Sequence, residues 1–173
     1  GRELIAALQT LPGHVRSILE RNEAIRRVAE QYASSRSMLF LGRLANYPIA
    51  LEGALKLKEI SYIHAEALPA AELKHGVIAL VSPSVPTVLV APEDGVHEKN
   101  LATLQEIKAR GGPVIAVATE GDTAIAHRAD HVLWVPRTHD ILQPILNVIP
   151  LQLFAYHLAV LLGCDVDKPR NLA

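Results

Sequence analysis

The sequence is poor in cysteine, in aromatic side chains and in net charge. A single cysteine, Cys164, among 173 residues excludes an intrachain disulfide and favours a reducing setting. The 17 Lys and Arg side chains nearly balance the 18 Asp and Glu side chains, which gives a formal net charge of -1. This balance provides no electrostatic basis for binding nucleic acid or an anionic membrane. We therefore expect neither partner.

Signals for membrane insertion and for common cofactors are also missing. We expect no apolar run to approach the roughly 18–20 residues of a membrane span, and the first residues lack the apolar segment of a signal peptide. No metal-binding spacing of His and Cys and no glycine-rich nucleotide loop is present, so we expect no metal and no cofactor. Half of the residues are hydrophobic, which predicts one globular domain with a full core. The single cysteine and the missing membrane and signal-peptide patterns together predict a soluble, cytoplasmic protein.

The first 36 residues are helical in pattern. Apolar residues recur at helical spacing over residues 3–34, and Pro12-Gly13 predicts a break between two helices. The segment has no clear catalytic group. We interpret residues 1–36 as an N-terminal helical connector packed on a domain that spans residues 37–173.

After residue 36, short apolar runs alternate with helical segments. Buried strands are predicted at residues 37–41, 87–91, 114–118 and 131–135, and helices at residues 48–63, 98–110 and 142–162. Residues 64–80 are predicted to form a short strand or loop and one or two helical turns. Continuous apolar strands are typical of parallel sheets covered on both faces. The pattern predicts a doubly wound α/β fold of flavodoxin type, with a mainly parallel five-stranded sheet.

The predicted helix over residues 48–63 carries the most informative polar side chains. Glu52, Lys56 and Glu59 stand at i, i+4 and i+7, so they lie on one stripe of the helix. Leu51 and Leu55 begin another stripe, which is predicted to face the sheet. A carboxylate beside an ammonium can move a proton at a carbon next to a carbonyl. The same spacing is also typical of a solvated helix face with ion pairs worth a few tenths of a kcal/mol. From spacing alone, the solvated face is favoured.

A second candidate is His75, in the stretch ELKHG (residues 72–76) after the turn at Pro69. An exposed histidine at the end of a short helix titrates near neutral pH, which suits proton transfer to a sugar ring oxygen. The chain has eight histidines, so a single one is weak evidence. The residues by themselves predict an α/β domain with a ligand site near the helix at residues 48–63.

Several long motifs resemble the second sugar isomerase (SIS) domain of the glucosamine-6-phosphate synthase family. They are LGR (41–43), YPIALEGALKLKEI (47–60), HAEA (64–67), ELKHG (72–76), IPLQL (149–153) and the tail DVDKPRNLA (165–173). The motifs occur in the family's order and cover nearly the whole chain. Ala71 departs from the pattern, because a glycine is expected before ELKHG, and this alters the local turn.

The resemblance implies an enzyme of hexosamine and UDP-N-acetylglucosamine biosynthesis that makes glucosamine 6-phosphate from fructose 6-phosphate and glutamine. Glu59 matches the base that moves a proton between C1 and C2 of the sugar, and Lys56 matches the lysine that assists it. His75 matches the ring-opening histidine, which in the family reaches the active site of a partner subunit and so implies a homodimer. Ala173 matches a backbone contact to the substrate just before the Schiff-base lysine. Glu52, on the same stripe, is a further substrate-binding candidate.

The resemblance also implies partners outside this sequence. The family's first SIS lobe holds most contacts with the sugar phosphate, and a glutaminase domain releases the ammonia, so we expect this lobe to be inactive alone. Two alternatives remain open, namely a related sugar-phosphate isomerase or deglycase and a non-catalytic sugar-phosphate-binding regulator. The tail over residues 167–173 favours the synthase. The joint presence of Glu59, Lys56 and His75 argues against a pure sensor.

Overall fold

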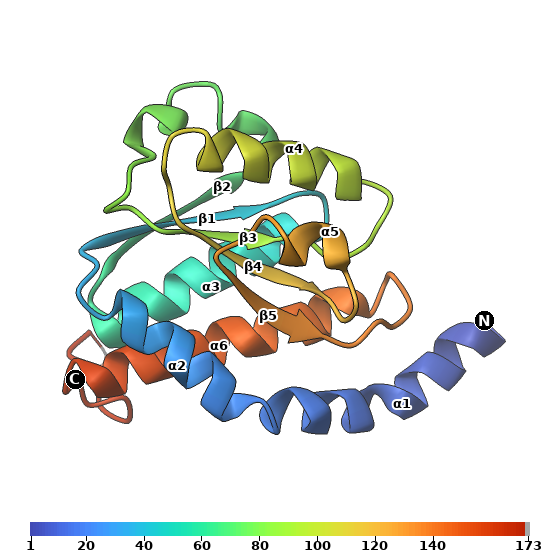
Figure 1. Cartoon of the computed structure of the whole chain (residues 1–173). Coiled ribbons are helices and arrows are strands. Elements are labelled where there is room, and N and C mark those ends of the chain that lie inside the picture. The colour runs from blue at the N-terminus through green and yellow to red at the C-terminus, as the bar shows by residue number, and fades with distance from the viewer. Residues whose placement is uncertain (172–173) are drawn as a thin grey trace.

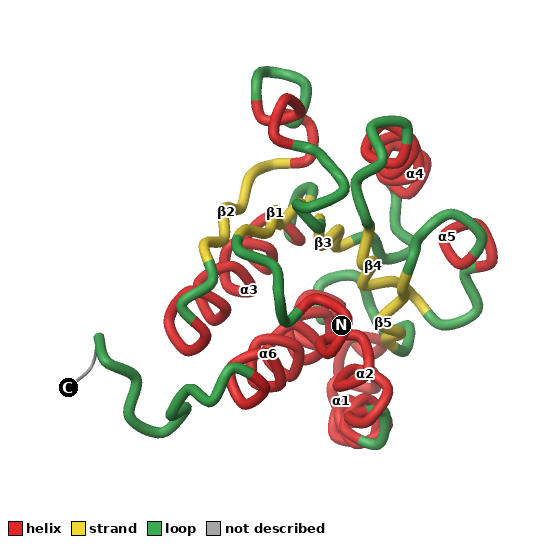
Figure 2. Tube along the Cα trace, turned by 60° about the vertical axis from the view of Figure 1, so that its left-hand side comes forward, coloured by secondary structure: helices red, strands yellow, loops and turns green. Residues whose placement is uncertain are grey.

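The computed structural model describes residues 1–171 and shows one parallel sheet between two helical layers (Figures 1 and 2). The strands are β1 (Ser37–Gly42), β2 (His64–Pro69), β3 (Thr87–Val90), β4 (Val114–Thr119) and β5 (His131–Val135). They lie in the order β2-β1-β3-β4-β5, and every neighbouring pair is parallel. The predicted doubly wound, five-stranded fold is therefore confirmed, and β2 is the strand that the sequence left open.

The helices divide between the two faces of the sheet. One face is covered by α2 (Asn22–Tyr32), α3 (Asn46–Ser61) and α6 (Gln143–Leu161). The other face is covered by α4 (His97–Lys108), α5 (Thr123–Ala126) and the 3-10 turns η1 (Ala70–Glu72) and η2 (Val77–Leu80). The N-terminal half of α1 (Arg2–Leu19) extends away from the body of the molecule (Figure 1).

The central strands are apolar because both of their faces are covered. Phe40 of β1 and Val88 of β3 lie in the core with α3 and α6. Leu39 and Leu89, their neighbours in sequence, lie in the core with α4. Side chains alternate between the faces of a strand, so two cores require continuous apolar runs, as the sequence predicted.

The face of α3 that packs on the protein core is not the predicted one. Leu51 and Leu55 are 44% and 42% exposed. The buried face consists mainly of small residues, namely Ala50, Gly53 and Ala54, together with Leu57. A β-carbon on Gly53 would lie 2.8 Å from Cδ1 of Leu151 on α6, so glycine permits the close approach of the two helices. The prediction that the leucine stripe faces the sheet is therefore wrong.

The predicted break at Pro12-Gly13 is also wrong, because α1 continues through Pro12 to Leu19. A proline inside a helix removes one backbone donor and frees one carbonyl, and the residues around Pro12 are largely exposed to solvent, which can solvate that carbonyl. The chain turns instead at Glu20–Arg21, between α1 and α2. The division of the chain at residue 36 remains a prediction.

The other predicted helix ends lie within two residues of the observed ones, but α5 was not predicted. The side chain of Asp122 caps this short helix, because its Oδ1 accepts a hydrogen bond from the backbone N–H of Ile125 at 3.0 Å. An aspartate before a short apolar stretch is a helix-start signal. The sequence therefore held a clue to α5.

The apolar helix α6 corrects the expectation about long hydrophobic runs. It has 19 residues, no charged side chain and a mean hydropathy of 1.6 over an 18-residue window, so it could cross a membrane by length and composition. Half of that window is buried inside the protein. Leu146, Phe154 and Leu158 of α6 lie in the core with α2 and α3. A core helix meets the same criteria, so they are weak evidence for a membrane segment.

Candidate functional site

Three charged side chains form a partly exposed stripe along α3. Lys56 Nζ donates a hydrogen bond to Glu59 Oε2 at 2.7 Å and lies 3.9 Å from Glu52 Oε1. The bond to Glu59 raises the pKa of Lys56, and partial burial opposes this effect. Lys56 is therefore an ammonium ion at neutral pH, held between two carboxylates. The structure brings together these three predicted residues.

The ends of α3 are fixed by backbone geometry. A β-carbon on Gly42, at the end of β1, would lie 2.1 Å from the carbonyl oxygen of Asn46, so only glycine lets the helix begin this close to the strand. At the other end, Tyr62 has a φ of 63° in the left-handed region and stops the helix. The charged stripe thus stands on a helix with both ends held.

The C-terminal tail is attached to the end of α3. The backbone N–H of Arg170 donates a hydrogen bond to Tyr62 Oη at 3.0 Å, and the Arg170 guanidinium lies 3.9 Å from the centre of the Tyr62 ring. Tyr62 follows Glu59 by three positions, so the tail is held near the catalytic candidate. Ala173, the predicted backbone contact, lies outside the described residues.

His75 lies on the other side of the sheet from this stripe. It stands in the turn after η1, its side chain is 71% exposed, and its Nδ1 is 2.6 Å from Glu72 Oε2. Its neighbour Leu73 is buried in the core with α4, whereas α3 covers the opposite face (Figure 2). Within one chain, the structure does not bring His75 to Lys56 and Glu59.

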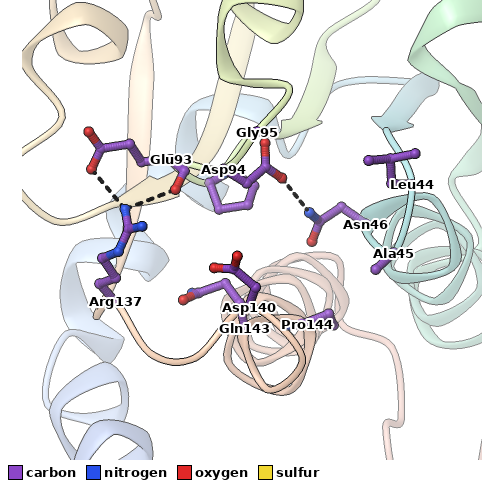
Figure 3. Close-up of a pocket in the computed structure, with 11 residues that line it drawn as sticks. Leu44, Ala45, Asn46, Glu93, Asp94, Gly95, Arg137, Asp140, Gln143 and Pro144 are labelled. Atoms are coloured by element: carbon purple, nitrogen blue, oxygen red, sulfur yellow. Dashed lines mark hydrogen bonds and ion pairs between the residues drawn. The ribbon is translucent and has the colours of Figure 1, made fainter. Parts of the chain in front are cut away.

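A cavity of about 200 Å³ lies beyond the carboxyl ends of the strands (Figure 3), where open α/β sheets bind ligands. Its charged lining residues are Glu93, Asp94, Arg137 and Asp140, and Arg137 Nη1 is 3.3 Å from Glu93 Oε2. Three carboxylates against one guanidinium make this cavity unsuitable for a phosphate. Among residues 1–171, no group of three or more His, Cys, Asp or Glu is placed to hold a metal ion.

A chain of amide side chains holds the loops around this cavity. Asn46 Nδ2 donates to Asp94 Oδ2 at 3.4 Å, and Asn147 Nδ2 donates to Asn46 Oδ1 at 2.8 Å. Gln143 Nε2 in turn donates to Asn147 Oδ1 at 3.0 Å. This series of hydrogen bonds connects the loops after β1 and β3 with α6. Sequence reasoning missed it, because Asn46 and Asn147 are 101 positions apart.

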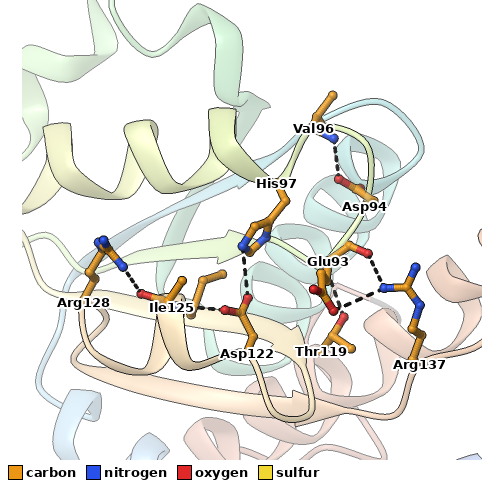
Figure 4. Close-up of polar contacts among 10 residues, drawn as sticks. Glu93, Asp94, Val96, His97, Thr119, Asp122, Ile125, Arg128 and Arg137 are labelled. Atoms are coloured by element: carbon orange, nitrogen blue, oxygen red, sulfur yellow. Dashed lines mark hydrogen bonds and ion pairs between the residues drawn. The ribbon is translucent and has the colours of Figure 1, made fainter.

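A second set of polar contacts joins the loops after β3 and β4 (Figure 4). His97 Nε2 lies 3.5 Å from Oδ2 of Asp122, whose side chain is only 4% exposed. The hydroxyl of Thr119 accepts a hydrogen bond from the backbone N–H of Glu93 at 2.9 Å. Because Asp122 also caps α5, these contacts serve to fix the loops.

Known proteins similar to this chain match almost all of it, but they are much longer than this chain. The SIS domain family matches residues 31–162. The chain is 54% identical over 172 residues to the glutamine–fructose-6-phosphate aminotransferase [isomerizing] of Thermus thermophilus, and 53% identical over 171 residues to that of Pseudomonas aeruginosa. Each comparison covers 99% of this chain and 28% of the relative. The chain thus spans less than a third of the length of these curated relatives.

Solved structures agree with this relationship. The C-terminal domain of glucosamine-fructose-6-phosphate aminotransferase from Francisella tularensis has a TM-score of 0.85 at 44% identity, over 92% of this chain and 45% of that one. The sugar isomerase domain of the RpiR transcription factor from Sphaerobacter thermophilus has a TM-score of 0.77 at 18% identity, over 94% and 93% of the two chains. The second likeness shows the fold alone.

Proposed function

The chain belongs to the SIS domain family, and we propose that it is the lobe of a glutamine–fructose-6-phosphate aminotransferase that carries the acid/base residues for sugar isomerisation. The observation that carries this proposal is the 2.7 Å hydrogen bond between Lys56 and Glu59 on a helix with fixed ends. A carboxylate positioned by an ammonium on a rigid element suits proton transfer at carbon. Fructose 6-phosphate is the proposed substrate and glucosamine 6-phosphate the proposed product.

Glu59 is the proposed base. Once the C2 ketone has become a protonated imine, a proton leaves C1, its electron pair forms a C1–C2 double bond, and the C2–N π pair moves to the nitrogen. The C1 hydroxyl then loses its proton and becomes an aldehyde, and the pair of the C1–C2 double bond takes up a proton at C2. C1 is thereby oxidised and C2 reduced, with no external oxidant. One carboxylate beside both carbons can remove and return the proton. Lys56 holds that carboxylate in place, and its charge stabilises negative charge that develops on the C1 oxygen.

The lobe needs a covering surface for this chemistry. Lys56 and Glu59 line none of five pronounced cavities in the described part of the chain. Leu51 and Leu55, which flank the charged stripe, are more than 40% exposed. Exposed apolar side chains beside a polar site are typical of a docking face. We assign this face to the first SIS lobe of a longer parent chain, and we expect the isolated lobe to be inactive.

His75 completes the proposed site from a second subunit. Its strong exposure and its place on the other side of the sheet from α3 support a role between subunits. We therefore propose a homodimer in which the His75 side chain of one subunit opens the sugar ring bound to the other. A glutaminase domain of the parent chain is the proposed source of ammonia, and a cytoplasmic location remains a prediction.

Steady-state kinetics of the parent enzyme test this function. Glu59→Gln is expected to lower kcat by about 100-fold or more, in the range of a lost general base, with KM changed little. Glu98→Gln is the matched control, since Glu98 is an exposed glutamate of α4 on the opposite face, and kcat is expected to be unchanged. A proportional loss of affinity in Glu59→Gln, with kcat retained, would show a binding role and contradict the proposal.

A further inference from the structure

A basic groove lies on the side of the sheet opposite Lys56 and Glu59. Two adjoining cavities of about 160 and 250 Å³ share Arg43, Ala71 and Lys99 as lining residues. Arg43 directly follows β1, Ala71 belongs to η1, and Lys99 stands in the first turn of α4. Three elements therefore converge on one groove at the carboxyl edge of the sheet.

The positive charge of the groove is only partly compensated. Lys74 Nζ lies 2.7 Å from Glu106 Oε1 in the larger cavity. Within residues 1–171, neither Arg43 nor Lys99 forms an ion pair. Three cations against one carboxylate leave two unbalanced positive charges, although the whole chain has a net charge of -1.

The Arg43 guanidinium is held in place by one hydrogen bond, and not all of its N–H donors have partners. Its Nη2 donates a hydrogen bond to Thr103 Oγ1 at 3.0 Å, and Thr103 Oγ1 in turn donates to the carbonyl oxygen of Lys99 at 3.0 Å. The Nε of Arg43 is buried and has no hydrogen-bond partner among the described residues. A buried donor without a partner is costly. The guanidinium is thus positioned beside the cavities and still has hydrogen bonds to offer.

We propose that this groove binds a phosphate dianion, free or as the phosphate group of a small phosphomonoester. Guanidinium donors match phosphate oxygens in geometry, and a lysine in the first turn of a helix adds charge where the helix dipole also favours an anion. The site lies apart from the charged stripe of α3. The proposed function assigns most contacts with the sugar phosphate to the first SIS lobe. The groove would be a separate phosphate-binding site on this lobe.

The test is an NMR titration of the chain with inorganic phosphate at low ionic strength. Saturable shifts are expected at backbone amides of residues 42–44, 71–74 and 97–103. The double variant Arg43→Gln/Lys99→Gln is expected to weaken binding by about tenfold or more, since charge-assisted hydrogen bonds are lost. The charge-matched control, Arg27→Gln/Lys58→Gln, removes two exposed cations elsewhere and is expected to change affinity by less than about twofold.

A parallel titration with fructose 6-phosphate separates the two sources of the phosphate. The same shifts at higher affinity would identify a phosphomonoester as the ligand, whereas shifts with inorganic phosphate alone would identify the free ion. Glu59→Gln is expected to leave these shifts unchanged. A negative result in the phosphate titration would therefore not affect the proposed role of Glu59, and a negative result in the Glu59→Gln kinetics would not affect the phosphate site. If Arg43→Gln unfolds the chain, Lys99→Gln alone carries the test, because Lys99 is exposed.

Three results would overturn the proposal. One is the absence of saturable shifts up to about 10 mM phosphate, because a dissociation constant above about 10 mM is too weak for a metabolite site. Another is an equal loss of affinity in the control variant, which would show only a general charge effect. The third is a change in sedimentation of the double variant without any effect of phosphate, which would assign the groove to carboxylates of another protein surface.

Discussion

At the scale of single residues, the state of Lys56 is set by its neighbours. The hydrogen bond to Glu59 raises its pKa above the ordinary value of 10.5. Because the pKa of Lys56 is higher in the folded state than in the unfolded state, the Lys56–Glu59 pair stabilises the fold fully below the unfolded pKa. This contribution is lost as the pH rises through the folded pKa. Across the physiological range, Lys56 therefore stays charged and keeps Glu59 in one position.

Substitution of Lys56 tests this positioning role. Lys56→Gln in the parent enzyme is expected to lower kcat by about 10- to 100-fold, because the Glu59 carboxylate loses the hydrogen bond that positions it and the site loses a positive charge. Lys58→Gln, an exposed lysine two positions on, is expected to keep kcat within about twofold. Steady-state kinetics provide the comparison. Equal effects of the two substitutions would show that Lys56 has no special role.

His157 gives a prediction about acid stability. Burial lowers its pKa below the ordinary 6.5, and its Nε2 lies 2.7 Å from Asn22 Oδ1. A lowered folded pKa means that the unfolded chain binds a proton first, so stability is full above pH 6.5 and falls as the pH drops through the folded pKa. The free energy of unfolding in urea is expected to be lower at pH 5.5 than at pH 7.5, by about 1 kcal/mol or less from this group.

Two histidine substitutions separate this effect from general acid sensitivity. In His157→Gln, the difference in unfolding free energy between the two pH values is expected to shrink. In His127→Gln, which changes an exposed histidine, the difference is expected to persist. An unchanged pH dependence in His157→Gln would refute the assignment.

At the scale of elements, the closest contact is the one between β1 and the start of α3. Gly42→Ala places a β-carbon 2.1 Å from the Asn46 carbonyl oxygen, a backbone atom that cannot rotate away. The expected loss is about 1–3 kcal/mol or more of unfolding free energy, the range for overpacking. Gly13→Ala is the control, because nothing lies within 4 Å of its added β-carbon and alanine favours a helix interior. Equal stabilities of the two variants in urea unfolding would contradict this account.

The elements also show how far sequence reasoning reaches. Apolar runs predicted the sheet, and the spacing of Glu52, Lys56 and Glu59 predicted one stripe, because both features depend on local periodicity. The buried face of α3 was missed, since close packing at Gly53 depends on α6, almost a hundred positions away in the sequence.

Features built from several loops were out of reach for the same reason. Arg43 and Thr103 meet across 60 positions, and Asn46 and Asn147 across 101. Neither pair leaves a periodic signal in the sequence. The relation of His75 to the stripe could not be derived from spacing either, because they lie on opposite faces of the sheet.

At the scale of the whole molecule, the account requires more than one copy of the lobe for each complete site. If Glu59 and His75 of one site come from different subunits, an inactive Glu59→Gln enzyme and an inactive His75→Asn enzyme complement each other. After dissociation and reassociation of an equal mixture, half of the dimers are mixed and each has one intact site. Activity is expected to recover to roughly a quarter of the wild-type value. No recovery, with mixed dimers shown by tag pull-down, would place both residues in the same subunit.

The central claim is that Glu59 moves the proton between C1 and C2 of the sugar. The most direct measurement is exchange of the C1 protons of fructose 6-phosphate with solvent in D₂O, followed by NMR, with the parent enzyme and with its Glu59→Gln variant. The account predicts that exchange at C1 is lost in Glu59→Gln while fructose 6-phosphate still binds and while Glu98→Gln exchanges normally. Wild-type exchange at C1 in Glu59→Gln would contradict the account and assign the base to another residue.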